Sequence, residues 1–196
     1  MNYLLPRKSV SNNGHEVMMA PFDEEYTHRT LTIVGEITAE VATSVNAALR
    51  CLSRESDEDI VLYIQSAGGE VRSGLSIVDT IHSIKCDVIT VAAGSACSMA
   101  ALIVAAGTKS KRWCLPNSEI MIHQPLGGAH GPATDIQVAA ANILKTKERL
   151  NKLLAQFTEQ PYEKVCADTE RDRWLDAEQA ATYGIVDRIG DPFSEY

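Results

Sequence analysis

Apolar residues form short continuous runs along the chain, and these alternate with stretches of helical spacing. Residues 31–34, 60–64 and 88–92 are such runs, which are typical of strands buried on both faces of a sheet. Residues 39–52 and 71–84 instead carry apolar side chains every three or four positions, which predicts helices between these strands. The alternation predicts an α/β domain with substantial parallel strand pairing.

The alternation continues in shorter elements toward the C-terminus. Residues 112–115 and 120–122 are expected to be strands, and residues 98–106 and 176–183 short helices. The first helix is rich in small side chains, which suits close packing on a sheet.

One predicted helix is much longer than the others. Residues 132–157 keep apolar side chains at three- and four-residue spacing over about seven turns, and Pro132 suits the first turn of a helix. Within this apolar stripe only Lys147 is an interruption. A helix of this length often reaches beyond its own domain, so we expect it to project. The glycine-rich loop before it contains Gly127 and Gly128.

The first thirty residues behave differently. They lack sustained periodicity and include a polar run from Ser9 to Gly14, which cannot bury much surface. We expect residues 1–30 to form a mobile N-terminal arm, with Tyr3, Leu4 and Leu5 as an anchor. Residues 31–196 are expected to form a single domain.

Composition narrows the class of protein. The chain has 196 residues and a formal charge of −8, and this acidic balance argues against a nucleic-acid or membrane-surface protein. The most apolar stretch, residues 88–107, is too often interrupted by Gly and Ser to span a bilayer. No secretory leader is recognisable at the N-terminus, so a cytoplasmic location is expected. The five cysteines show no metal or disulfide spacing, which favours buried reduced thiols and no bound metal.

Three places in the sequence could carry chemistry. Residues 94–100 lead from a strand into a helix and could present Ser98 or Cys97 at the helix N-terminus, where free N–H groups stabilise an anion. Residues 66–69, Ser-Ala-Gly-Gly, form a second strand-to-helix turn whose glycines can aim N–H groups at a carbonyl oxygen or a phosphate. Tight packing and a plain turn are the simpler explanations of these two segments taken alone.

His123 is the third place. It follows the apolar run 120–122 directly, and a histidine at the end of a strand next to a loop is placed as a general base would be. Such a base needs an acid to orient it. Spacing alone does not choose among the downstream candidates, which are Asp168, Asp172, Asp176 and Asp187.

Several longer motifs resemble one protein family. Gly94 to Ala100, Met121-Ile-His-Gln-Pro-Leu-Gly-Gly128 and Asp168-Thr-Glu-Arg-Asp-Arg173 are similar to the proteolytic subunits of the Clp protease, ClpP. The similarity covers roughly residues 30 to 190 in one register. It implies a ClpP/crotonase-like core of repeated ββα units wound in a spiral, with residues 132–158 as a projecting handle helix and residues 1–30 as an arm or axial loop.

The resemblance also assigns roles to residues. It implies that Ser98 is the nucleophile of a serine endopeptidase, His123 the general base and Asp172 the acid that orients the histidine. The N–H groups of Gly69 and Met99 match the family's oxyanion hole.

The family works as an assembly. The resemblance implies two stacked heptameric rings around a chamber in which unfolded proteins are cut to short peptides, with Glu170 and Arg171 at the interface between rings. An AAA+ unfoldase of the Clp type delivers the substrates and uses the ATP. The chain itself is therefore expected to need no cofactor.

The sequence departs from the family pattern in several places. Residues 65–69 read Gln-Ser-Ala-Gly-Gly where the family usually has Asn-Ser-Pro-Gly-Gly, and Ala100 replaces a usual Gly. Val61 and Ser83 stand where aromatic residues commonly form the unfoldase-docking groove. These departures indicate a specialised second paralogue, which assembles with another ClpP subunit or uses a different unfoldase.

Two alternatives remain beside the peptidase. The chain could be a non-catalytic or weakly active ring subunit that assembles with another ClpP paralogue, and the altered docking positions keep this alternative open. A crotonase-type enzyme acting on acyl-CoA shares the implied fold, but neither paired acidic residues near the 66–69 turn nor a second oxyanion motif supports it.

Overall fold

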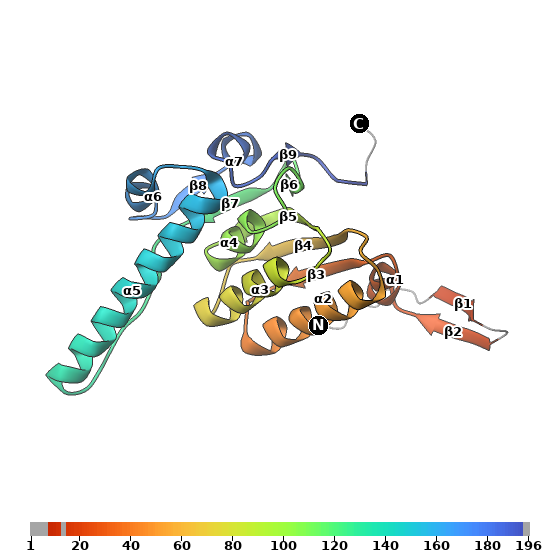
Figure 1. The fold of residues 1–196 in the computed structure, drawn as a ribbon, viewed down its shortest axis with the longest axis horizontal. Coiled ribbons are helices and arrows are strands. Elements are labelled where there is room, and N and C mark those ends of the chain that lie inside the picture. The colour runs from red at the N-terminus through yellow and green to blue at the C-terminus, as the bar shows by residue number, and fades with distance from the viewer. Residues whose placement is uncertain (1–7, 13–14, 194–196) are drawn as a thin grey trace.

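A seven-stranded sheet, mostly parallel, forms the centre of the molecule, and one long helix extends away from it (Figure 1). The computed structural model describes residues 8–12 and 15–193. The strands of the central sheet are β3 (Thr30–Val34), β4 (Ile60–Ser66), β5 (Val88–Cys97), β6 (Arg112–Cys114), β7 (Glu119–Ile122), β8 (Arg173–Leu175) and β9 (Arg188–Ile189).

Strand β5 divides the sheet into two branches. The main path runs β3-β4-β5-β6-β9 with parallel pairing throughout. The first half of β5 pairs with β6 at residues 90–92, whereas its last three residues, 95–97, pair with β7. Strand β8 then pairs with β7 in the antiparallel direction. The C-terminal end of β5 therefore lies between β4 and β7, and β8 follows on the far side of β7.

Helices connect the strands and cover the sheet. Helix α2 packs against α3, and α3 packs against α4, which also contacts β5. A small hairpin of β1 and β2 lies at the opposite side of the molecule from the long helix (Figure 1). The remaining elements are β1 (Lys8–Asn12), β2 (His15–Met19), α1 (Pro21–Thr27), α2 (Ala39–Glu55), α3 (Val71–Ser83), α4 (Met99–Ala105), α5 (Ala133–Thr158), α6 (Tyr162–Asp168) and α7 (Ala177–Tyr183).

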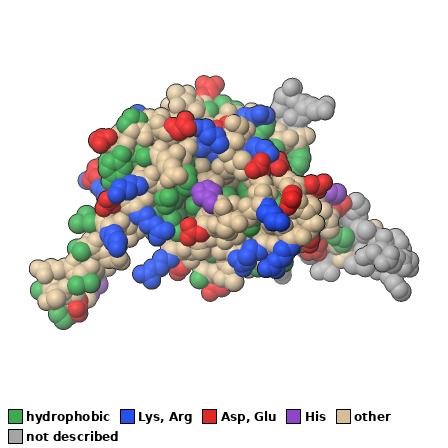
Figure 2. Space-filling model, viewed as in Figure 1, with side chains coloured by type: hydrophobic (Ala, Val, Ile, Leu, Met, Phe, Trp, Pro, Cys, Tyr) green, Lys and Arg blue, Asp and Glu red, His purple; other side chains and the backbone are tan. Residues whose placement is uncertain are grey.

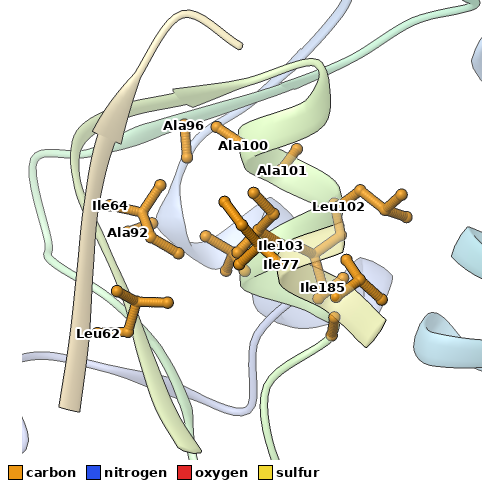
Figure 3. Close-up of a cluster of buried hydrophobic side chains, with 14 of the residues drawn as sticks. Leu62, Ile64, Ile77, Ala92, Ala96, Ala100, Ala101, Leu102, Ile103 and Ile185 are labelled. Carbon is orange, nitrogen blue, oxygen red and sulfur yellow. The ribbon is translucent and has the colours of Figure 1, made fainter. Parts of the chain in front are cut away.

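The core lies between the sheet and helices α3 and α4. Leu62 and Ile64 of β4 face small residues of β5 and α4, and Ile103 of α4 packs beside Ile77 of α3 (Figure 3). Every residue of α4 is buried, which explains why its sequence consists of alanines and aliphatic side chains. Helix α4, which begins directly after Ser98, is therefore fixed by packing on all sides.

Helix α5 is exposed over most of its length. Only Asn151, Leu154 and Thr158, in its second half, are buried. Its first half carries exposed apolar side chains, including Val138 and Leu144, and hydrophobic side chains are visible on the projecting arm in Figure 2. The prediction of a long projecting helix is confirmed, with residues 133–158 as its bounds.

The α/β prediction is confirmed, and the differences lie in short elements. Residues 8–27 contain the β1–β2 hairpin and helix α1, where the sequence predicted no regular structure. Strands β6 and β7 and helices α4 and α7 are present as predicted. Helix α6 and strands β8 and β9 were not predicted, because they are short and have few buried residues and so show no apolar run or period. Tyr3, Leu4 and Leu5 lie outside the described residues.

The cysteine prediction holds for three of the five residues. Cys86, Cys97 and Cys114 are buried, Cys166 is half-buried and Cys51 is exposed on α2, and all five are free thiols. The expectation of buried thiols is thus wrong for Cys51, which points away from the apolar face of its helix. None of the helices in the described ranges 8–12 and 15–193 is long and apolar enough to cross a membrane.

Candidate active site

Ser98 occupies a strained turn between β5 and α4. Its backbone has φ +57° and ψ −120°, a conformation that residues other than glycine rarely adopt. The backbone N–H of Ser98 donates to the carbonyl oxygen of Met121 on β7 at 2.8 Å, which holds the turn against the neighbouring strand. The hydroxyl does not cap the helix, although serine is a favoured N-cap residue. It is directed instead toward His123.

The glycine turn of residues 66–69 lies directly against Ser98. A Cβ atom on Gly68 would stand 2.7 Å from the Cβ of Ser98 and 2.8 Å from the carbonyl oxygen of Cys97, and Gly68 has φ +101°. Only glycine fits there without displacing the serine. The hydroxyl of Ser66 accepts a hydrogen bond from the Gly68 N–H at 3.0 Å, which fixes the turn from within.

Gly69 is held by the segment before α2. The N–H of Ile37 donates to the carbonyl oxygen of Gly68 at 2.9 Å, and the N–H of Glu70 donates to the carbonyl oxygen of Ile37 at 2.9 Å. A side chain on Gly69 would collide with the Ile37 backbone. The backbone on either side of Gly69 is therefore fixed by hydrogen bonds, which orients the peptide N–H between them.

His123 and Asp172 lie opposite each other at the end of the β7–β8 ladder. The last residue pair of that ladder is Ile122 with Arg173, so His123 and Asp172 are the next residues on each strand. The Nδ1 atom of His123 is 3.0 Å from Oδ1 of Asp172, and its Nε2 atom is 2.8 Å from the Oγ atom of Ser98. The side chain of His123 is 14% exposed and that of Asp172 is 62% exposed. A continuous hydrogen-bonded series therefore runs from the carboxylate to the hydroxyl.

The other three candidate acids have different partners. Asp168 pairs with Lys164 and Arg173, Asp176 caps helix α7, and Asp187 pairs with Arg112. Of the four acids that the sequence left open, the structure thus brings only Asp172 within hydrogen-bonding distance of His123.

Two N–H groups flank the serine. Met99 is the first residue of α4, so its N–H is one of the helix N-terminal donors that have no acceptor within the helix. Gly69 follows Gly68, which contacts the serine directly. The two residues named for an oxyanion hole therefore adjoin Ser98 from two different turns.

Cys97 was the alternative nucleophile in this turn. Its side chain is buried at 5% exposure, and this burial raises the pKa of the thiol above its ordinary value. The thiolate is the reactive form of cysteine, so a raised pKa makes the group inert at neutral pH. The geometry favours Ser98.

A small apolar pocket opens beside Ser98 and His123. Its volume is about 40 Å³, and its walls include Leu102 of α4 and Leu150 and Leu154 of α5. Two polar residues of its lining, Asn151 and Thr169, are hydrogen-bonded to each other at 3.2 Å. The surface that the pocket offers to a ligand is therefore mainly apolar.

A polar bridge adjoins the three residues on the side of α5. The Nζ atom of Lys147 donates to Oε1 of Gln124 at 3.0 Å and to Oε2 of Glu170 at 2.6 Å. The side-chain amide of Gln124 donates to the backbone oxygen of Glu170 at 2.8 Å. Glu170 and Arg171 were expected at an interface between rings; in the single chain Glu170 contacts Lys147 and Arg171 is exposed. The sequence assigned no role to Gln124 or Lys147, although the charge of Lys147 within an apolar stripe was a signal.

Metal-binding residues do not gather in the described part of the chain. His, Cys, Asp and Glu side chains there form no group of three or more that could hold a metal ion.

Residues 13–192 match the family model described as Clp protease. The match includes Ser98, His123 and Asp172, together with the whole of helix α5.

Proposed function

Because the chain belongs to the Clp protease family, we propose that it is a serine endopeptidase subunit that cleaves unfolded proteins with Ser98, His123 and Asp172. The observation that carries this proposal is the position of His123, which lies 2.8 Å from Ser98 and 3.0 Å from Asp172 through its two ring nitrogens. This is the geometry that a general base needs to activate a hydroxyl.

The first step forms an acyl-enzyme. The Oγ atom of Ser98 attacks the carbonyl carbon of a peptide bond while Nε2 of His123 accepts the hydroxyl proton. Asp172 accepts a hydrogen bond from Nδ1–H, which selects the tautomer with a free Nε2 and stabilises the imidazolium that forms. The proton then passes from His123 to the leaving amine, the peptide bond breaks, and the N-terminal part of the substrate remains esterified to Ser98.

The second step releases the product. A water molecule gives a proton to His123 and attacks the ester, and Ser98 recovers its proton when the ester bond breaks. The N–H groups of Gly69 and Met99 are proposed to donate to the negative oxygen formed in each step. Loss of one such donor costs about 3–4 kcal/mol of transition-state stabilisation in serine proteases.

The pocket supports a preference at the cleavage site. Its apolar walls from α4 and α5 lie directly beside the nucleophile. We propose that it receives the side chain on the acyl side of the cleaved bond, and that an apolar side chain of modest size fits best.

Members of the Clp protease family generally form ring oligomers and work with Clp unfoldases. We propose that this chain enters two stacked heptameric rings, either alone or with a second ClpP subunit, and that an AAA+ unfoldase feeds it. The exposed apolar residues of α5, Ile136, Val138 and Leu144, support such an assembly, because several exposed apolar side chains on one projecting helix segment mark a surface that a partner covers. Glu170 and Arg171 are proposed to take part in that interface.

The test is fluorophosphonate labelling of the assembled protein, together with cleavage of a short fluorogenic peptide. We expect one label per chain, located at Ser98, and its complete loss in Ser98→Ala. Ser95→Ala serves as the matched control, because Ser95 lies three residues earlier on β5 and outside the triad. An assembled protein that neither labels nor cleaves would contradict the proposal.

A mixing experiment tests the non-catalytic alternative. Ser98→Ala chains are assembled with an active ClpP paralogue and compared with mixtures that contain the wild-type chain. Equal activity of the two mixtures would favour a purely structural role, whereas a lower activity with Ser98→Ala would support catalysis by this chain.

A further inference from the structure

Lys147 is the one charged residue on the otherwise apolar stripe of helix α5. Its side chain is 24% exposed, although lysine is rarely drawn into partly buried positions without a specific partner. The residues one turn later, Leu150 and Asn151, line the pocket beside Ser98. Lys147 therefore lies next to the proposed active site. Apolar packing of the stripe does not account for a charged residue at this position.

The neighbouring segment runs along α5 and depends on it for support. Residues 123–130 have no regular secondary structure. His123 lines the same pocket as Leu150, Gln124 contacts Lys147, and a side chain on Gly127 would meet Ile143 at 2.7 Å. The segment after His123 thus follows the helix toward its N-terminus, with Lys147 as its polar contact.

The loop that carries Asp172 is equally irregular. It spans residues 169–172 between α6 and β8, and the β7–β8 ladder stops at the pair Ile122 and Arg173. His123 and Asp172 are the first residues beyond that ladder, so no backbone pairing holds them together. Something else must set the distance between the two side chains.

The bridge from Lys147 closes this gap. Gln124 is the residue after His123, and Glu170 lies two residues before Asp172. Lys147 donates to both side chains at 3.0 and 2.6 Å, and the amide of Gln124 donates to the backbone of Glu170 at 2.8 Å. The hydrogen bond from Lys147 lowers the pKa of Glu170, so the carboxylate stays charged at neutral pH. The three groups extend the ladder by side chains where backbone pairing has ended.

We propose that Lys147 is a positioning residue for the proposed peptidase reaction: through Gln124 and Glu170 it holds the His123 segment against the Asp172 loop. This inference rests on the proposed function. It links helix α5 to the chemistry by one cation, so a movement of the helix at this point changes the spacing of base and acid. A catalytic base displaced by about 1 Å can lose about 100-fold in rate, which sets the scale of the expected effect.

The experiment compares kcat and KM of assembled variants on a short fluorogenic peptide, with active sites counted by fluorophosphonate labelling. Lys147→Met keeps the aliphatic stem and removes the charge. We expect kcat to fall by about 10- to 100-fold while KM stays within about twofold, because the apolar pocket is unchanged. Lys147→Arg can donate to both partners and is expected to restore kcat to within about threefold of wild type. Lys152→Met is the matched control, since it removes an exposed ion pair with Glu148 on the same helix.

Gln124→Met tests the bridge from its other end without altering α5. We expect a loss similar to that of Lys147→Met, and no further loss when the two changes are combined, because residues that act as one unit are not additive. If Lys147→Met fails to assemble, as judged by sedimentation, the kcat of Gln124→Met decides the question.

The outcomes are distinguishable. If wild type neither labels nor cleaves, the proposed function falls and this inference falls with it. If wild type is active and the two bridge variants keep kcat within about twofold, the inference alone is overturned. A loss that Lys147→Arg does not restore, or one that Lys152→Met shows equally, would also overturn it.

Discussion

The residues of the proposed triad come from two regions that are held in different ways. Ser98 lies between a central strand and a helix whose every residue is buried, and Gly68 fits against it with no spare room. His123 and Asp172 lie where a short ladder ends, and the carboxylate is 62% exposed. Packing therefore positions the nucleophile, whereas hydrogen bonds at the margin position the base and the acid. The second region is therefore the more exposed of the two.

The largest expected effect comes from Asp172, the exposed acid at the end of the β7–β8 ladder. Asp172→Asn keeps the size of the side chain but removes the charge, so His123 loses the partner that selects its tautomer and stabilises its protonated form. We expect kcat for peptide cleavage to fall by about 10⁴-fold. Asp176→Asn is the control, because asparagine also caps a helix well and Asp176 caps α7. A loss below about tenfold in Asp172→Asn would show that another group orients His123.

A second change removes the counter-charge of a buried arginine that joins the core to the end of α5. Arg112 is 3% exposed and donates to both carboxylate oxygens of Asp187 and to the carbonyl oxygen of Phe157 near the end of α5. Asp187→Asn leaves the buried guanidinium without its counter-charge. We expect the free energy of unfolding to fall by about 3–5 kcal/mol at neutral pH, measured by urea titration.

The same ion pair predicts a pH dependence. Burial acts to raise the pKa of Asp187, but the hydrogen bonds from Arg112 outweigh it, and the pKa lies below its ordinary value of 3.8. A lowered pKa stabilises the fold above pH 3.8, and this contribution is lost as the pH falls further. The stability difference between wild type and Asp187→Asn should therefore shrink on acidification below about pH 4. A constant difference across that range would contradict the assignment.

The smallest effects compare the buried core with the exposed first half of helix α5. Ile103→Ala removes a fully buried side chain of α4 and is expected to lower the free energy of unfolding by about 2–5 kcal/mol. Leu144 on helix α5 is 66% exposed, so Leu144→Ala should change the free energy of unfolding by less than about 0.5 kcal/mol in the single chain. Urea titrations at equal, low protein concentration make the comparison, because assembly itself adds stability. A large effect of Leu144→Ala under conditions that keep the chain monomeric would show that the first half of α5 packs on the core.

Long, periodic segments could be predicted from the sequence, and so could the short elements with apolar runs or helical spacing, which are β6, β7, α4 and α7. Short elements without such a pattern could not. The strands β3, β4 and β5 and the helices α2, α3 and α5 follow from apolar runs and spacing over four or more residues. Strand β8 has three residues, two of them exposed, so its sequence contains no period from which to recognise it. Its place in the sheet depends on β7, which lies about fifty positions earlier.

The candidate site divides in the same way. Ser98 and Gly69 stand out locally because small residues and paired glycines mark sharp turns. The choice of Asp172 among four acids, and the contact of Lys147 with Gln124 and Glu170, have no local signal apart from one charge on an apolar stripe. Family resemblance named Asp172, but the residues themselves left it open.

The sequence by itself determined the α/β class and the long helix, because both follow from patterns among residues close together in the chain. It also determined which kinds of side chain are available for chemistry. Only the tertiary structure decided which of those side chains meet. His123 reaches Ser98 across 25 positions and Asp172 across 49, and the ladder that ends at Ile122 and Arg173 brings His123 beside Asp172. Such contacts arise from strand register and helix packing, which combine many weak preferences over the whole chain and leave no trace at either residue alone.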